Sequence, residues 1–212
     1  MAKVVIDISN IKHQRKNYLK GATPDQKKAI KYFMPDDGCK GLFTKVKDEV
    51  YDAIVQNAIK SSNSYQRALD KIGMDESELK EIPPVTLRAY ADSEFAKANK
   101  NNHYRSNLYS ITHIFFSSNQ VYFYNLTLNM MKNEKKESTE EYFYKDITNF
   151  STSTDTTEAL AFKGCSGKPH RVTFDTQKFS LVVPGDKQTV ATHGDIDESI
   201  RAMKNKLREK KM

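Results

Sequence analysis

The sequence of 212 residues has no tryptophan and only two cysteines. Cys39 and Cys165 lie far apart, and neither belongs to a Cys-x-x-Cys pair, so the spacing gives no sign of a cysteine-based metal or redox site. We expect both to stay as thiols in a reducing compartment. Glycine-rich loops of the Gly-x-Gly-x-x-Gly and Gly-x-x-x-x-Gly-Lys types are also missing. The sequence therefore shows no cradle for a nucleotide phosphate.

The five histidines are scattered, and none has a partner at the spacing of a metal site. Cys165 and His170 are close in sequence, but the segment CSGKPH reads more simply as a surface turn than as a nucleophile with its base. Adjacent carboxylates such as Asp36 and Asp37 fall in turns or helix starts, where capping and solvation explain them. We expect no enzyme activity, no metal and no cofactor. An active site assembled from residues distant in sequence is the alternative left open.

Long apolar runs are absent too. None reaches the roughly 20 residues that cross a bilayer, and the N-terminus lacks the apolar core and cleavage site of a signal peptide. Hydrophobic residues make up 38% and charged residues 29% of the chain, which indicates a globular protein. Because we find no export signal, we expect it in the cytoplasm. The net charge of +7 divides into +3 for residues 1–84 and +4 for residues 85–212. Neither part has the concentrated positive charge typical of a nucleic-acid-binding domain.

The first part of the chain has helical patterning. Thr23 is a suitable cap, Pro24 suits the first helical position, and Gln26 can bond back to the cap. These residues predict a helix from Pro24 to about Met34. The Pro-Asp-Asp-Gly sequence that follows ends it, because proline disfavours the helical conformation of the residue before it.

A second helical segment begins at Leu42, where apolar residues recur at spacings of three and four and predict four or five turns. Residues 61–64 end it, and another short helix follows up to Gly73. Asp75 then opens a single capped turn. We assign residues 1–84 to a small helical unit, which can cover a sheet, pair with a second copy or bind a partner helix.

Aromatic and β-branched residues are densest between residues 111 and 150. Residues 109–116 and 121–128 predict a hairpin across the short polar connection SSNQ. The charged segment KNEKKESTE, residues 132–140, predicts a loop, and residues 141–150 predict a third strand.

The rest of the chain predicts short strands and a final helix. A Ser/Thr-rich segment precedes three short strands, at residues 159–163, 171–175 and 179–183. The clearest turns in this part of the chain are at residues 164–168 and 184–186. Asp195, with Glu198 three positions later, predicts a capped amphipathic helix at the end of the chain.

This order of segments resembles the bacterial pleckstrin-homology-like (PH-like) domains. The resemblance runs through ITHIFFSSNQVYFYN, a charged loop, YFYKDITNF, short strands and the helix DIDESIRAMKNKLREK, and covers residues 85–210. Its most telling segment is residues 144–147, where the family has a Tyr-Lys-Asp-Ile-like strand start. Asn119 and Gln120 depart from the family, which often has a basic residue near this turn. The tryptophan found in the terminal helix of the eukaryotic relatives is also absent.

We thus predict an α+β fold with two parts. Residues 1–84 form a helical N-terminal unit, and the resemblance implies that residues 85–212 form an antiparallel PH-like β-barrel capped by the C-terminal helix. The predicted function is that of a non-enzymatic protein-interaction or adaptor module. A partner protein or self-association is favoured over lipid, with exposed strand edges and aromatic clusters as contact surfaces.

Two basic groups are the candidate binding residues. The resemblance implies binding through loops at the open end of the barrel, where cations can meet anionic lipid or an acidic or phosphorylated partner, although interleaved glutamates oppose their field. The terminal helix supports the alternative function, a weak electrostatic binder of nucleic acid or an anionic membrane surface, which salt would disrupt. Stabilisation of a helix C-terminus by cations also explains the basic residues of the terminal helix without a ligand. The first group is Lys132, Lys135 and Lys136, and the second is Arg201, Lys204 and Arg208.

Overall fold

The computed structural model describes residues 11–35, 45–74, 83–98, 104–163 and 168–192, with residues 201, 204, 205 and 207–209 of a C-terminal helical segment. Both cysteines, the capped turn at Asp75 and the cap at Asp195 lie outside these residues. The helices are α1 (Ile11–Leu19), α2 (Pro24–Phe33), α4 (Asp48–Ser62) and α5 (Ser64–Ile72). The strands are β1 (Val85–Tyr90), β2 (Ala96–Ala98), β3 (Tyr104–Ser106), β4 (Leu108–Phe116), β5 (Gln120–Asn129), β6 (Lys135–Phe143), β7 (Asn149–Lys163), β8 (Lys168–Val183) and β9 (Asp186–Thr192).

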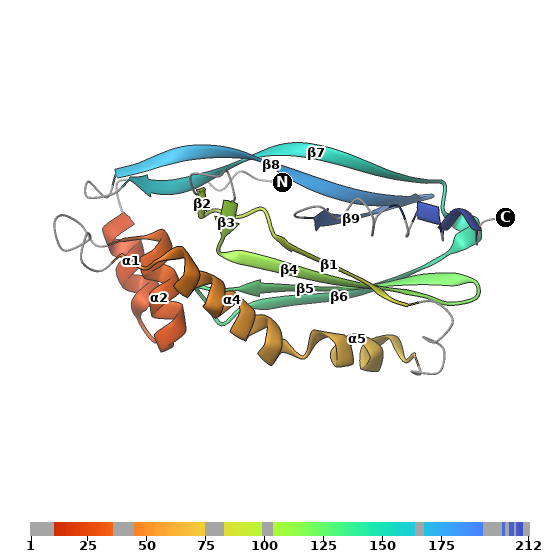
Figure 1. Ribbon diagram of the computed structural model, residues 1–212, viewed down its shortest axis with the longest axis horizontal. Coiled ribbons are helices and arrows are strands. Elements are labelled where there is room, and N and C mark those ends of the chain that lie inside the picture. The colour runs from red at the N-terminus through yellow and green to blue at the C-terminus, as the bar shows by residue number, and fades with distance from the viewer. Residues whose placement is uncertain are drawn as a thin grey trace.

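The described strands form antiparallel sheets with the orders β1-β4-β5-β6, β7-β8-β9 and β2-β3. In Figure 1 the four-stranded sheet lies between α4 and α5 on one side and the three-stranded sheet on the other, with α1 and α2 at one end. This arrangement confirms the predicted α+β class. The sheets are not closed, so the predicted barrel is not observed.

The central strands β4 and β5 of the four-stranded sheet have buried residues on both faces. Alternate residues of a strand point to opposite faces, so Ile114 and Phe123 face the three-stranded sheet while Phe115 and Tyr124 face α5. A third apolar cluster joins α2 and α4 to Phe95 and to the start of the β5–β6 turn. The sheet is therefore the central layer of the fold.

The predicted helices agree closely with the structure where their signals are local. Thr23 and Gln26 form the predicted capping box at the start of α2. The break between α4 and α5 falls at Asn63, within the predicted segment. The predicted start at Leu42 is wrong, because α4 begins only at Asp48 and residues 45–47 are not helical.

The predicted charged loop is wrong as well, because most of it is β6, from Lys135 to Phe143. An edge strand with open faces can carry charged side chains without burying them. The resemblance places a strand start at residues 144–147, but residues 144–146 form a 3-10 turn between β6 and β7. The Ser/Thr-rich segment belongs to β7, since threonine favours extended backbone. β7 and β8 are thus two long strands in place of short ones, and the turn at residues 184–185 is confirmed.

Gly73 ends α5 in the left-handed conformation, with φ at +74°, and its N–H bonds the carbonyl of Leu69 at 2.8 Å. Replacing it with alanine is expected to lower the free energy of unfolding by about 1 kcal/mol, because a side chain at positive φ is strained even in open space. Urea denaturation measures the loss. Gly73→Asn should lose less, since asparagine tolerates this conformation, and equal losses for the two variants would contradict the explanation.

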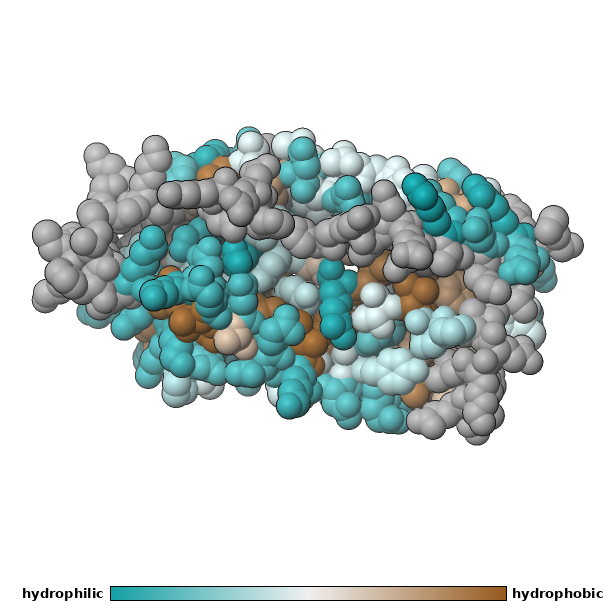
Figure 2. Space-filling model, viewed as in Figure 1, coloured by the Kyte–Doolittle hydropathy of each residue, from teal (hydrophilic) through white to brown (hydrophobic). Residues whose placement is uncertain are grey.

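Figure 2 shows mostly hydrophilic residues on the coloured part of one face, with hydrophobic residues visible in separate areas between them. Within the described residues, no helix is both long and apolar enough to cross a membrane.

Candidate functional site

A cleft between α4 and strands β5 and β6 is the candidate functional site. It encloses about 680 Å³. Its floor is apolar and comes from one face of α4, with Ile54 and Ala58, from one face of β5, with Leu126 and Leu128, and from Met130 just after β5. Its rim is polar and includes the side chains of Asp25, Gln26, Asn57, Ser61, Ser62, Arg67, Asn129, Lys132, Asn133, Glu134, Lys135 and Glu137.

The periodicities of the two elements explain why the floor is apolar. Ile54 and Ala58 are four residues apart and share a face of α4. Leu126 and Leu128 are two residues apart and share the helix-facing side of β5. The sequence therefore presents two apolar rows that meet across the cleft.

Asn129 fixes the β5–β6 turn that forms one wall. Its side-chain amide donates to Glu134 at 3.1 Å, and its side-chain oxygen accepts the N–H of Met131 at 3.0 Å. Asn107 also donates to that oxygen, at 3.4 Å. These bonds hold the turn so that Lys132 and Glu134 stand at the mouth of the cleft, 3.6 Å apart.

A second cavity of about 610 Å³ lies on the other side of the same turn, against α1 and the start of α2. Lys132 reaches over the ring of Tyr18, with its ammonium 5.1 Å from the ring centre. Burial raises the pKa of Tyr18 and that of Glu94, another lining residue. The cavities share Gln26, Lys132, Asn133 and Glu134, so the turn separates two parts of one recessed region.

A cluster of three cations around one carboxylate borders the cleft. Glu137 of β6 accepts bonds from Arg67 and from Lys71 of α5, the latter at 2.6 Å, and Lys135 lies 3.4 Å away. The hydrogen bond from Lys71 is the main reason that the pKa of Glu137 is lowered. Only 9% of this side chain is exposed, so the cluster ties α5 to the edge of the sheet.

The predicted binding residues fall in separate places. Lys132 and Lys135 both line the cleft, whereas Lys136 points to the opposite face of β6. On the C-terminal helical segment, Arg201 and Arg208 are exposed and Lys204 is partly buried. The guanidinium of Arg208 lies 5.6 Å from the ring centre of Phe150. The structure does not test whether any of these residues binds a ligand.

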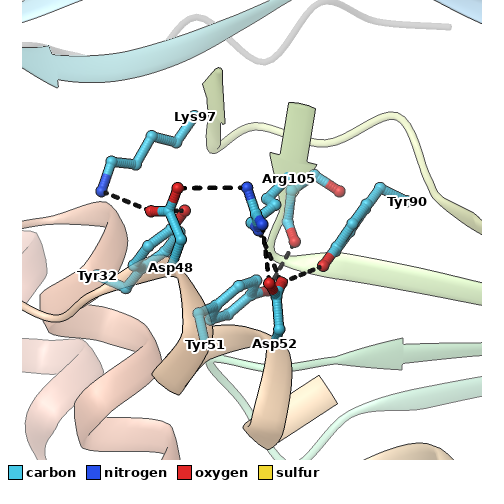
Figure 3. Close-up of polar contacts among 8 residues, drawn as sticks. Tyr32, Asp48, Tyr51, Asp52, Tyr90, Lys97 and Arg105 are labelled. Atoms are coloured by element: carbon cyan, nitrogen blue, oxygen red, sulfur yellow. Dashed lines mark hydrogen bonds and ion pairs between the residues drawn. The ribbon is translucent and has the colours of Figure 1, made fainter. Parts of the chain in front are cut away.

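A polar cluster, here called the clamp, joins α4 to the strands beyond it (Figure 3). Arg105 of β3 donates two bonds to the carboxylate of Asp52, at 2.7 and 2.8 Å, and a longer one of 3.4 Å to Asp48. Tyr90 also donates to Asp52, at 3.3 Å, and Tyr32 donates to Asp48, at 3.0 Å. The hydrogen bonds from Arg105 are the largest cause of the lowered pKa of Asp52. Each charge of the clamp has a partner, which indicates a structural role.

A second buried polar contact joins α5 to the sheet. His113 of β4 lies 2.9 Å from the hydroxyl of Ser64 through Nε2 and 2.8 Å from that of Thr86 through Nδ1. Burial, followed by the nearby charge of Arg88, lowers the pKa of His113 to about 4. The ring is therefore neutral at neutral pH. Ser64 and His113 line neither of the two cavities.

The sequence interpretation missed the cleft, the clamp and the contact at His113. Arg67 and Lys71 carry one usable signal, because a spacing of four places them on the same helix face. Their shared partner, Glu137, lies 70 positions after Arg67 in the sequence. No local pattern indicates that pairing. The apolar residues of the cleft floor follow the same helix and strand spacing as core residues, so the sequence did not indicate a cleft.

Comparison with known proteins gives no matching family model, curated protein or solved structure. An assignment of function therefore rests on the residues of this chain.

Proposed function

We propose that the protein is a non-enzymatic interaction module that binds a polypeptide segment along the cleft and the neighbouring edge of β6. The observation that carries this proposal is the position of an apolar-floored cleft beside a strand with one partner in the described sheet. A polypeptide uses both features, because its backbone can pair with a strand edge while its apolar side chains enter a pocket.

The charges of the cleft favour a polypeptide over a polyanion. Its lining has three cations, Arg67, Lys132 and Lys135, and three acids, Asp25, Glu134 and Glu137. Nucleic acids and anionic headgroups are bound through a surplus of positive charge. A balanced rim offers no such surplus and suits a mixed polar and apolar segment.

The resemblance to PH-like domains is part of this proposal. A four-stranded antiparallel sheet, a three-stranded antiparallel sheet and a helical segment follow one another in the order that a PH-like domain requires. We assign residues 85–212 to that domain, with residues 1–84 as a helical unit packed on it, in a bacterial cytoplasm.

Site-specific crosslinking in cells tests the proposal. A photoreactive amino acid replaces Ser61, an exposed residue at the cleft rim, and as a control it replaces Thr152, an exposed residue of β7. We expect covalent protein adducts from position 61 that are absent from position 152. Adducts should fall when Ala58→Glu places a charge on the apolar floor.

Three results would count against the proposal. The first is equal crosslinking at the two positions, which would show non-specific contact. The second is the absence of protein adducts from position 61 and from a probe on β6. The third is binding to DNA or to anionic vesicles that weakens steeply with salt, which would favour the electrostatic alternative on the terminal helix.

A further inference from the structure

β6 is the open edge of the four-stranded sheet, because in the described part of the chain it pairs only with β5. The backbone hydrogen bonds at its two ends show which peptide groups of β6 point toward β5 and which point outward. The carbonyl of Glu134 accepts the N–H of Asn129, and the N–H of Tyr144 donates to the carbonyl of Asn119, so both ends of the segment face β5 through even-numbered residues. The N–H and C=O groups of the odd-numbered residues, from 135 to 143, therefore point outward.

The side chains along this edge have a charge pattern that is complementary to itself. Two lysines, Lys135 and Lys136, precede Ser138, and two glutamates, Glu140 and Glu141, follow it at matching distances. When two such strands run antiparallel with Ser138 opposite Ser138, Lys135 stands opposite Glu141, and Lys136 stands opposite Glu140. Residues directly opposite in an antiparallel pair share a face of the sheet, so each lysine can reach its glutamate.

Other two-fold registers lose this match. Centring the pair on Thr139 places Glu137 opposite Glu141, and centring it on Glu137 places Glu134 opposite Glu140. Both create direct contacts between like charges, which are unfavourable. Centring on Ser138 also places outward-pointing odd residues opposite one another, as the backbone hydrogen bonds require. The registers centred on Glu137 and Thr139 meet this backbone requirement as well, so the charges are what select the register centred on Ser138.

The charged groups of the edge have room for new partners. Among the described residues, Lys136, Glu140 and Glu141 take part in no ion pair. Lys135 meets Glu137, which already has Arg67 and Lys71 as partners. Burial and then the charge of Asp186 raise the pKa of Glu140, so a lysine supplied from outside would stabilise its charged form.

From these observations we infer that β6 pairs with β6 of a second copy of this chain, in the antiparallel register centred on Ser138, and joins two four-stranded sheets into one continuous sheet. This inference rests on the proposed interaction function and names the occupant of the strand edge. The two-fold axis is perpendicular to the sheet, so the helices of both copies lie on the same side. The same charges oppose other registers and limit uncontrolled edge pairing.

The test is sedimentation analysis of charge-reversed variants of the full chain over a range of concentrations. Lys135→Glu with Lys136→Glu makes the edge acidic, and Glu140→Lys with Glu141→Lys makes it basic. Each variant alone should dimerise at least about tenfold more weakly than the unchanged protein, because all four cross-strand pairs become repulsive. An equimolar mixture should form a heterodimer, and the variant with all four changes should dimerise again.

The controls separate the register from general charge effects. Lys27→Glu with Lys28→Glu on α2 changes the net charge by the same amount as the acidic variant and should leave dimerisation unchanged. Far-UV circular dichroism checks that each variant is folded. Failure of the mixture to form heterodimers, or dimers that persist in both single-sign variants, would overturn the inference.

The oligomeric state of the unchanged protein distinguishes failure of this inference from failure of the proposed function. If it sediments as a monomer at the highest concentration it tolerates while position 61 still crosslinks to a different protein, this inference fails and the proposed interaction function stands. If it is monomeric and forms no protein adducts, both fail.

Discussion

Arg105→Ala is expected to lower the free energy of unfolding by about 2–3 kcal/mol. The guanidinium is the shared partner of Asp52 and Asp48, and its removal takes away the cation that pairs with Asp52 and leaves Asp48 with Lys97 alone, at 3.7 Å. Loss of one member of a buried ion pair costs about 3–5 kcal/mol. The expected loss is smaller here because the side chain of Asp52 is 41% exposed and water can partly replace Arg105. Urea denaturation measures the change.

Two matched variants test the explanation. Arg105→Lys keeps the positive charge but cannot make the paired bonds to Asp52, so it should lose an intermediate amount. Arg171 pairs with Glu158 at 2.9 Å on an exposed surface, and Arg171→Ala should cost less than about 1 kcal/mol. If Arg105→Ala destabilises the protein no more than Arg171→Ala, the clamp contributes little to stability.

The clamp also bears on how the two predicted parts of the chain are related. Asp48 and Asp52 belong to residues 1–84, and Arg105 belongs to residues 85–212. Tyr51 makes a further contact across this division, donating to the carbonyl of Ser106 at 2.7 Å. The division at residue 84 stays a prediction. These contacts lead us to expect that damage to the clamp lowers the stability of the helices and of the sheet together.

The sequence predicted the elements whose signals are local. The capping box at Thr23 and the glycine that ends α5 depend on neighbours within a few positions, and both were found as expected. The hairpin of β4 and β5 was also predicted correctly, because alternation and a short polar turn specify it. Local free energies dominate in these segments, and a single sequence records them.

The errors occur where tertiary position decides the structure. β6 has charged residues at most positions, and only its place at the edge of a sheet makes them compatible with a strand. The Ser/Thr-rich part of β7 is extended because β8 pairs with it along its whole length. The cleft depends on two elements that meet only after folding, so its apolar rows could not be distinguished from ordinary core residues.

His113 is expected to make the protein less stable in mild acid. Its pKa is lowered to about 4 in the folded protein, whereas an unfolded chain has a histidine pKa near 6.5. Above pH 6.5 the ring is neutral in both states. As the pH falls from 6.5 to 4, the unfolded state binds a proton that the folded state does not, so stability is lost. The difference corresponds to about 3 kcal/mol at the acid end of this range.

The groups around the ring explain why protonation is unfavourable. Ser64 and Thr86 supply neutral hydroxyls, Tyr65 and Tyr124 supply rings, and Arg88 supplies a positive charge. Burial and the charge of Arg88 both disfavour an imidazolium at this position. A proton on His113 would therefore be buried beside a like charge, which raises its free energy.

Urea denaturation from pH 7 to pH 4.5 measures the loss of stability, and His113→Gln isolates its cause. Glutamine keeps a donor and an acceptor but does not titrate, so the variant should lose stability less steeply as the pH falls. Carboxylates titrate in both proteins and largely cancel in the comparison. NMR titration of the His113 ring provides a direct second readout. Parallel pH profiles for the two proteins, or a measured pKa near 6.5, would show that the folded protein accommodates the imidazolium and that Ser64 and Thr86 do not hold the ring in its neutral form.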